Sequence, residues 1–201
     1  MSPVFAGLSV KSPIVAVLET DQGLIRCQLT YGRAPHAVTL FVGLATGRAA
    51  WREPRTGRVV TKPLYENLDF HRAITDVMIQ SGCPVGDSSG NPGYRIEIET
   101  KPDDVDELRR PGAIVLARYT PPPNRPDPSP PPVGHVLGSQ FAITLANMSH
   151  LAGQVSILGR CEDLETVRRI ARIVGNHQDQ VRLRKITIAN TDLNRVVPSQ
   201  N

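Results

Sequence analysis

The sequence predicts a mainly β protein, a closed barrel of about eight strands with two α-helices as lids. Short apolar runs bounded by glycine or proline recur along the chain, as in proteins built from many short strands. Two other segments space their apolar residues as helices do: one follows the first two strands and one precedes the last strand. The chain has 201 residues, of which 40% are hydrophobic and 21% charged, a composition typical of one globular domain.

The first predicted element is a β-hairpin. The apolar runs Ile14–Thr20 and Leu24–Thr30 flank the turn-like sequence Asp21-Gln22-Gly23. Apolar and polar residues alternate in the second run, so every second residue from Ile25 to Leu29 is expected to point inward.

Two helices are predicted from the apolar spacing. The first begins at Pro35, because the first helical turn tolerates the missing N–H of proline, and it ends at Gly47. The second runs from about Asp163 to Val174 and stops at Gly175. Its solvent face carries Arg168, Arg169 and Arg172.

The remaining strands are short. The runs that predict them are Val77–Gln80, Ala113–Ala117, Phe141–Leu145 and Val155–Leu158. A last strand is expected from Val181 to Ile188, and a strand region from Pro63 to Phe70. The stretch from Trp51 to Lys62 has no periodicity and is interpreted as a surface loop.

Proline-rich sequence interrupts the domain. Residues 120–132 hold eight of the 18 prolines, so an insertion at 119–133 is expected to form an extended loop and not a strand. The predicted organisation is an N-terminal extension (1–12), a domain (13–190) that contains this insertion, and a polar tail (191–201).

Charge and hydrophobicity exclude several classes of protein. The 23 basic and 19 acidic residues give a net charge of +4, but the basic residues form no runs of like charge and no stacking aromatics accompany them, so no nucleic-acid partner is predicted. No apolar stretch approaches the eighteen residues of a membrane span. The N-terminus is a poor secretory signal, and a cytoplasmic location is the default expectation.

The cysteines predict neither a disulfide framework nor a metal site. Cys27, Cys83 and Cys161 are odd in number, far apart and without a CxxC pair. Reduced and mostly buried thiols are the expectation.

Five blocks of sequence resemble one enzyme family. In order they are Phe70-His71-Arg72 with Val77 to Gly82 after it, Asn91-Pro92-Gly93-Tyr94, Pro111 to Ala117, Gly138 to Thr144, and Leu151 with Gly153 and Gly159. The chain from 13 to 190 thereby resembles the cyclophilin family of peptidyl-prolyl isomerases. The resemblance implies an antiparallel eight-stranded barrel capped by two helices, isomerisation of X-Pro bonds in peptides or proteins, and no cofactor or metal.

Arg72 is the catalytic residue that this resemblance implies. An amide resists rotation with a barrier of ~18–20 kcal/mol because the nitrogen lone pair is delocalised into the carbonyl. A fixed cationic donor that localises the lone pair in the twisted state lowers this barrier without a nucleophile. Strand alternation points the neighbouring His71 to the other face, so a structural role is expected for it.

The substrate-binding residues implied by the resemblance are Val77, Met78, Gln80, Ala117, Arg118, Gln140, Ala142, His150, Leu151 and Val155. The two glutamines are expected to hydrogen-bond the substrate backbone, and the Ala117-Arg118 pair to bind it through backbone groups, although the family has asparagine in place of this arginine. Of the five proline-pocket residues, only Met78 and Leu151 match the family.

The other three pocket positions depart from the family pattern. Val77 and Ala142 stand where the family has phenylalanine, and Val155 stands where it has histidine. Each lost ring would bury ~150–250 Å², so a wide, weak pocket and reduced efficiency are expected. His150 replaces the tryptophan that binds cyclosporin in many members, so tight binding of that drug is not expected.

Two alternatives stay open at this point. The altered pocket is also compatible with a non-catalytic, peptide-binding or chaperone-like module on the same fold. The proline-rich insertion could occupy the groove as a pseudo-substrate, recruit a partner that binds extended proline segments, or be a spacer.

Overall fold

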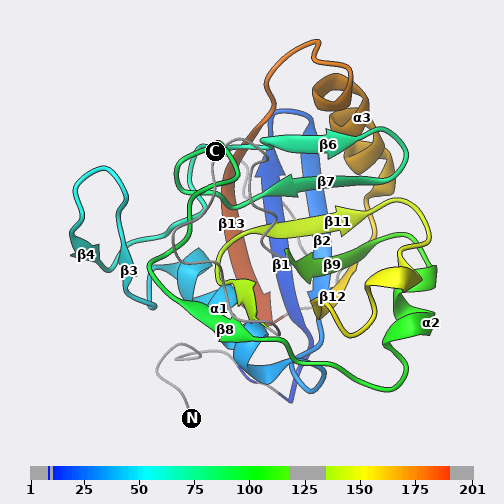
Figure 1. The fold of residues 1–201 in the computed structure, drawn as a ribbon, viewed down its shortest axis with the longest axis horizontal. Coiled ribbons are helices and arrows are strands. Elements are labelled where there is room, and N and C mark those ends of the chain that lie inside the picture. The colour runs from blue at the N-terminus through cyan, green and yellow to red at the C-terminus, as the bar shows by residue number, and fades with distance from the viewer. Residues whose placement is uncertain (1–8, 10, 118–134, 191–201) are drawn as a thin grey trace.

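The structure, a computed structural model, describes residue 9 and residues 11–117 and 135–190. The proline-rich insertion, Arg118 and the tail from 191 therefore lie outside the described residues. The mainly β prediction is confirmed: one large antiparallel sheet dominates the chain, with three α-helices around it (Figure 1).

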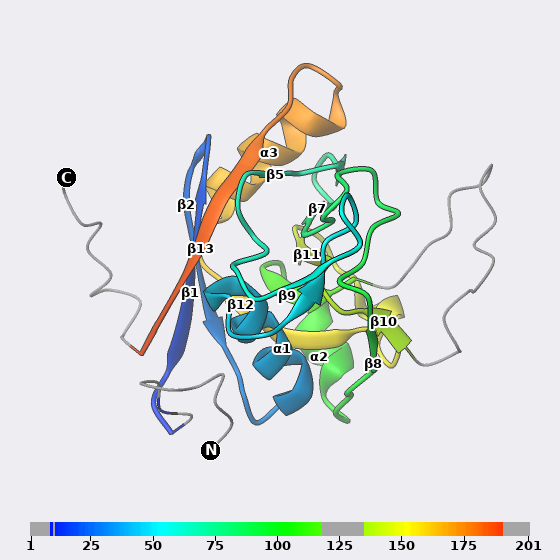
Figure 2. The same cartoon turned by 90° about the vertical axis from the view of Figure 1, so that its left-hand side faces the viewer.

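Three long strands form one wall of the molecule. β1 (Ile14–Thr20) and β2 (Gly23–Leu29) pair as the predicted hairpin, and the closing strand β13 (Arg182–Asn190) pairs with the other side of β1. Figure 2 shows these strands as a single layer, with most of the chain on one side of it. Every second residue from Ile25 to Leu29 is buried, so the predicted alternation is confirmed.

The sheet continues from β2 through shorter strands. They are, in spatial order, β12 (Ser156–Cys161), β9 (Ala113–Leu116), β11 (Phe141–Thr144), β7 (Met78–Ser81) and β6 (Arg72–Ile74). On the far side of β13 lies β5 (Leu68–Asp69). The sheet thus has nine strands, with β5 and β6 at its two edges.

The predicted closed barrel of eight strands is wrong, because the sheet curls into a half-barrel with two edges. The edge strands β5 and β6 are only two and three residues long and pair with different neighbours, β13 and β7. Only Phe70 and His71 separate them along the chain. This short covalent link therefore spans the opening that a ladder of hydrogen bonds would close in a complete barrel.

Both predicted helices are confirmed, and they cover opposite ends of the curled sheet (Figures 1 and 2). α1 (Pro35–Thr46) ends where Gly47 adopts a left-handed conformation with φ of 70°. The carboxylate of Glu99 accepts hydrogen bonds from the free N–H groups of His36 and Ala37 in its first turn. α3 (Leu164–Gly175) packs mainly against β6, β7 and β2.

Two short helical elements were not predicted. α2 (Asp104–Arg109) and the 3-10 helix η2 (Ser149–Leu151) lie against each other beside β9 (Figure 1). Neither is long enough to show helical periodicity in the sequence. No helix in the described ranges has the length and apolar character needed to cross a membrane.

The stretch from Trp51 to Lys62, predicted as a surface loop, forms a small hairpin instead. β3 (Trp51–Arg52) pairs with β4 (Val59–Val60), and Figure 1 shows the pair projecting away from the large sheet. Trp51 anchors this hairpin, since its indole N–H donates to the carbonyl of Lys62 at 2.9 Å.

A second two-stranded sheet joins β8 (Arg95–Glu97) and β10 (His135–Leu137). Strands this short leave no alternating pattern.

An aromatic cluster fills the main core between the sheet and α1. Phe41 on α1 lies 5.1 Å from Tyr65 and 5.6 Å from Phe141 on β11, measured between ring centroids. The hydroxyl of Tyr65 donates to the carbonyl of Ser139 at 2.9 Å, and complete burial raises the Tyr65 pKa well above its usual value of 10. This hydrogen bond satisfies the buried hydroxyl and ties the core to the chain just before β11.

Two cysteines form a disulfide, which corrects the expectation of reduced thiols. Cys27 on β2 and Cys161 on β12 are direct partners across the antiparallel ladder, and their sulfur atoms are bonded. Cys83 is a buried free thiol, as expected. The sequence does not show the pair because 134 residues separate the two cysteines and only the strand pairing brings them together.

We expect loss of this disulfide to lower the free energy of unfolding by about 2–5 kcal/mol, because the bond closes a long loop in the unfolded chain. Urea unfolding of the wild type with and without dithiothreitol, and of a Cys27→Ala/Cys161→Ala variant, measures the difference. Cys83→Ala is the control and should keep the effect of dithiothreitol. Three reactive thiols in the unreduced, denatured wild type would contradict the disulfide, which predicts one.

Candidate functional site

The register of three strands collects polar and apolar side chains on the outer face of the sheet. Arg72 on β6 lies opposite Gln80 on β7, and Gln80 lies opposite Ala142 on β11. Directly opposed residues in an antiparallel sheet share a face, and so do residues two apart on one strand. Met78 therefore joins this face, whereas Ile79 points into the main core.

A chain of hydrogen bonds links Arg72 to the interior. Arg72 Nη1 donates to Gln80 Oε1 at 3.3 Å, and Gln80 Nε2 donates to Gln140 Oε1 at 2.8 Å. Gln140 Nε2 donates in turn to the carbonyls of Ser88 and Gly90, at 2.9 and 2.8 Å. Gln80 is only 7% exposed and Gln140 only 1%, so the two amides hold each other in a fixed orientation.

Arg72 itself is exposed at the edge of the sheet. Of the ion pairs between described residues, none includes Arg72. A guanidinium has five N–H donors, and the single bond to Gln80 leaves the others available to a ligand. The site thus presents a permanent positive charge that no carboxylate of the described chain neutralises.

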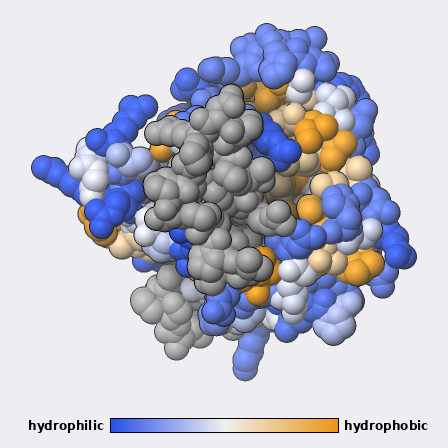
Figure 3. Space-filling model, viewed as in Figure 1, coloured by the Kyte–Doolittle hydropathy of each residue, from blue (hydrophilic) through white to orange (hydrophobic). Residues whose placement is uncertain are grey.

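An apolar cluster lies on the same face, separated from the main core by the sheet. Its buried members are Met78, Leu108, Ala113, Val115, Ala142, Val155 and Ile157, and Val77, Leu151 and Ala152 pack against them. Figure 3 shows apolar residues on this face at the right-hand ends of β6 and β7. All five residues expected to line the proline pocket belong to this cluster. The fold brings them together from β7 and the residue before it, from β11, and from η2 and the loop after it.

A glycine allows the two glutamines to approach. Gly82 has φ of +86°, and a Cβ at this position would lie 2.3 Å from the carbonyl oxygen of Ser139. A larger residue would therefore push the segment that carries Gln140 away from β7. On its other side Gln140 is held by Ala117, whose N–H donates to the Gln140 carbonyl at 2.8 Å.

The other expected site residues lie around this centre. Ala117 is buried at the end of β9, and Arg118 lies outside the described residues. His150 is exposed on η2, and its carbonyl accepts a hydrogen bond from the Gln154 side chain at 2.9 Å. Its neighbour along the chain, Leu151, packs against the apolar cluster.

Sequence reasoning missed several contributors to the site. Val115 and Ile157 are opposite each other on β9 and β12 and form the floor of the apolar cluster. Alternation within the apolar run 113–117 could have indicated Val115. No sequence signal marks Ser88 and Gly90, since they act through backbone carbonyls.

His71 differs from its neighbour Arg72 in its surroundings. Its side chain is partly buried, and burial lowers the pKa of the imidazole below its usual value of 6.5. The ring is therefore neutral at pH 7. In the part of the chain that the structure describes, no three His, Cys, Asp or Glu side chains lie close enough together to hold a metal ion.

Comparison with known proteins finds one family. A protein-family model described as "Cyclophilin type peptidyl-prolyl cis-trans isomerase/CLD" matches residues 15–193. The chain is 35% identical to peptidyl-prolyl cis-trans isomerase B of Streptomyces anulatus, over 73% of this chain and 75% of that protein. It is 32% identical to peptidyl-prolyl cis-trans isomerase A of Mycobacterium tuberculosis, over 87% of this chain and 91% of that protein.

Solved structures share the fold. A cyclophilin-type peptidyl-prolyl cis-trans isomerase of Cryptosporidium parvum aligns with a TM-score of 0.66 and 23% identity, covering 90% of this chain and 99% of that one. A second structure of that protein, in the presence of the dipeptide Ala-Pro, aligns with a TM-score of 0.61.

We expect His71 to make the protein less stable as the pH falls below about 6.5. In the unfolded chain His71 takes up a proton near pH 6.5, whereas the folded protein, with its lowered pKa, does so only at lower pH. The unfolded state therefore binds more protons in this window, and the free energy of unfolding declines. Urea unfolding between pH 7.5 and 5.5 should show a shallower decline for His71→Gln than for the wild type or His150→Gln. Equal slopes would contradict the assignment.

Proposed function

Because the chain belongs to the cyclophilin-type peptidyl-prolyl cis-trans isomerase family, we propose that it isomerises X-Pro bonds in peptides or proteins on the outer face of β6, β7 and β11. One observation carries the proposal. The guanidinium of Arg72, without a carboxylate partner among the described residues, is hydrogen-bonded to the buried Gln80–Gln140 pair beside an apolar cluster. A positive donor and an apolar surface are the two features that a twisting prolyl amide requires.

Arg72 is assigned to the transition state. As the X-Pro bond twists, the nitrogen lone pair ceases to overlap with the carbonyl and becomes a hydrogen-bond acceptor. An N–H group of Arg72 would donate to it and so lower the barrier. Because Gln80 already fixes one side of the guanidinium, little reorganisation is needed when the charge distribution changes.

The two glutamines have different roles in this proposal. Both N–H groups of the Gln140 amide are used by the Ser88 and Gly90 carbonyls, so it has no donor left for a substrate. The Gln80 amide donates one of its two N–H groups to Gln140, and the other is left to donate to a substrate. We therefore assign backbone binding of the substrate to Gln80 and positioning of Gln80 to Gln140.

The proline ring would dock on the apolar cluster, near Met78, Ala142 and Leu151. Alanine and valine offer less surface than the aromatic rings of the family at Ala142 and Val77, so a raised KM and reduced efficiency are expected. We assign backbone binding of the substrate also to Ala117, through its carbonyl because its N–H already donates to the Gln140 carbonyl, and to Arg118, which lies outside the described residues. His150 stands where many members of the family have the tryptophan that binds cyclosporin, so tight binding of that drug is not expected. A purely binding or chaperone-like role is not favoured, since Arg72 is present and accessible.

Replacement of Arg72 tests the mechanism directly. We expect Arg72→Ala to lower kcat/KM for a proline tetrapeptide by about 10²–10³-fold, the effect of removing one transition-state donor. Exchange between cis and trans signals in NMR spectra measures the rate without a coupled protease. Arg172→Ala, which removes an exposed arginine from α3, is the matched control and should retain wild-type turnover. Equal rates for Arg72→Ala and the wild type would refute the assignment.

A ring added to the pocket tests the origin of the reduced efficiency. We expect Ala142→Phe to lower KM several-fold with a smaller change in kcat, because added apolar contact stabilises the bound substrate and the transition state alike. Steady-state NMR exchange at several peptide concentrations separates the two constants. An unchanged KM in a variant whose urea midpoint matches the wild type would show that the missing ring does not limit binding.

A further inference from the structure

The small hairpin at 51–62 concentrates the positive charge of the protein. It carries four cationic residues against the single carboxylate of Glu53, a surplus of three positive charges, whereas the whole chain has a surplus of four. The cations are Arg52, Arg55, Arg58 and Lys62, and all four side chains are exposed. One projecting element thus carries most of the net charge.

Internal contacts hold this hairpin in a defined shape. Trp51 is buried at its base, and the Lys62 ammonium lies 5.7 Å from the centre of the indole ring. The backbone N–H of Arg52 donates to the carbonyl of Pro92 at 2.8 Å, which fastens the hairpin to the loop that follows β7. A cationic surface that is already ordered loses little conformational entropy when a ligand binds to it.

Three of the four cations are available to an anionic ligand. Lys62 is paired with Glu53 at 2.6 Å. The side chains of Arg55 and Arg58 have no hydrogen bond or ion pair with any other described residue, and the guanidinium of Arg52 uses one N–H group on the carbonyl of Gly57. The planar guanidinium fork suits a carboxylate because it can donate two parallel hydrogen bonds.

A hollow of about 250 Å³ lies between the hairpin and the loop that follows β7. Arg52 and Pro54 of the hairpin line it together with Val85 and Gly90 of that loop, and Arg52 is the only charged residue in its lining. The carbonyl of Gly90 accepts the hydrogen bond from Gln140, at the inner end of the chain that begins at Arg72. The hollow and Gln140 thus share the loop that carries Gly90.

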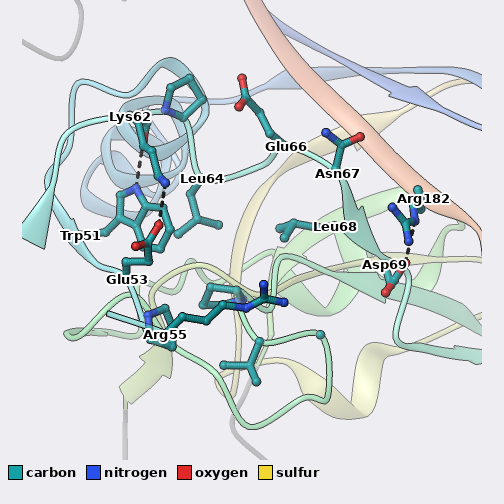
Figure 4. Close-up of a pocket in the computed structure, with 15 residues that line it drawn as sticks. Trp51, Glu53, Arg55, Lys62, Leu64, Glu66, Asn67, Leu68, Asp69 and Arg182 are labelled. Carbon is teal, nitrogen blue, oxygen red and sulfur yellow. Dashed lines mark hydrogen bonds and ion pairs between the residues drawn. The ribbon is translucent and has the colours of Figure 1, made fainter. Parts of the chain in front are cut away.

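Figure 4 shows a second hollow, of about 420 Å³. Pro54 and Val85 line both hollows. Its charges are balanced. Glu53 pairs with Lys62 and Asp69 pairs with Arg182 at 3.5 Å, which leaves the cation of Arg55 and the carboxylate of Glu66. This hollow therefore does not favour an anion, and the smaller one does.

We propose that Arg52, Arg55 and Arg58, with the smaller hollow, form an accessory surface that binds an acidic segment of the client protein whose proline occupies the active site. The protein then prefers X-Pro bonds that have Asp or Glu residues a few positions away. This substrate preference rests on the proposed isomerase function. A peptide fits better than a nucleic acid, because the only aromatic residue of the hairpin, Trp51, is buried and cannot stack on bases.

The test compares peptides that share one proline-containing core. One peptide is neutral, and two carry three Glu residues on the N-terminal or C-terminal side, three to five positions from the proline. NMR titration and exchange give the affinity and turnover of each. The variant is Arg52→Glu/Arg55→Glu/Arg58→Glu, and the matched control is Arg168→Glu/Arg169→Glu/Arg172→Glu on α3, which changes the net charge equally.

We expect one acidic peptide to bind wild type about three- to tenfold more tightly than the neutral peptide, as a few exposed ion pairs allow. This ratio should fall to one or below in the hairpin variant, persist in the α3 variant, and decrease as salt is added. Equal binding of acidic and neutral peptides by the wild type, or an equal loss of preference in both variants, would overturn the accessory surface.

Failure of the isomerase function gives a different result. If the wild type turns over none of the three peptides, the proposed function is overturned, while the titration still decides whether the hairpin binds acidic segments. A fluorescent single-stranded oligonucleotide at 150 mM salt serves as the competing ligand. Hairpin-dependent binding of it that is tighter than binding of the acidic peptide would assign the surface to nucleic acid and overturn the proposal.

Discussion

The pairing of β7 between β6 and β11 is the constraint on which both the core and the candidate site depend. Arg72, Gln80 and Ala142 share the outer face only in this register. A shift of one residue would bring Ile79 to the outer face and turn Gln80 into the apolar interior, where its amide would lack partners. The main core opposes such a shift, since Phe141 on β11 packs in the aromatic cluster on the inner face.

The same packing orients the chain of hydrogen bonds from Arg72 to Gln140 before any substrate binds. The Tyr65 hydroxyl donates to the Ser139 carbonyl, and the N–H of Ala117 donates to the Gln140 carbonyl. Gly82 lets the segment that carries Ser139 and Gln140 lie against β7. Gln140 is thereby fixed, and through it Gln80 and one face of the Arg72 guanidinium. Electrostatic stabilisation of a transition state is largest when the donors are oriented in advance, and here the core supplies the orientation.

The sequence predicts those features that local pattern determines. Apolar alternation and helical spacing suffice for the hairpin β1–β2 and for α1 and α3, and the resemblance indicated Arg72 and the five apolar pocket residues. Features that depend on contacts between segments far apart in the sequence were not predictable. The Cys27–Cys161 bond follows from the pairing of β2 with β12, and the open edge of the sheet follows from the few residues that join β5 to β6. The backbone carbonyls that hold Gln140 could not be predicted, because every residue type has such a carbonyl.

The proposed proline pocket and the cationic hairpin are related by energetics. In this proposal Ala142 and Val77 offer a proline ring less contact than aromatic side chains would, so less binding energy would be available at the reacting bond itself. Contacts remote from that bond can supply binding energy that holds the substrate in place and offsets such a loss. Arg52 lies beside the loop whose Gly90 carbonyl fixes Gln140, so under the proposal contacts at the hairpin would act on the same bound peptide. Under this proposal, substrate specificity comes more from the residues that flank the proline than from the proline ring. A pocket with few contacts distinguishes substrates poorly, whereas a positively charged surface favours negatively charged segments.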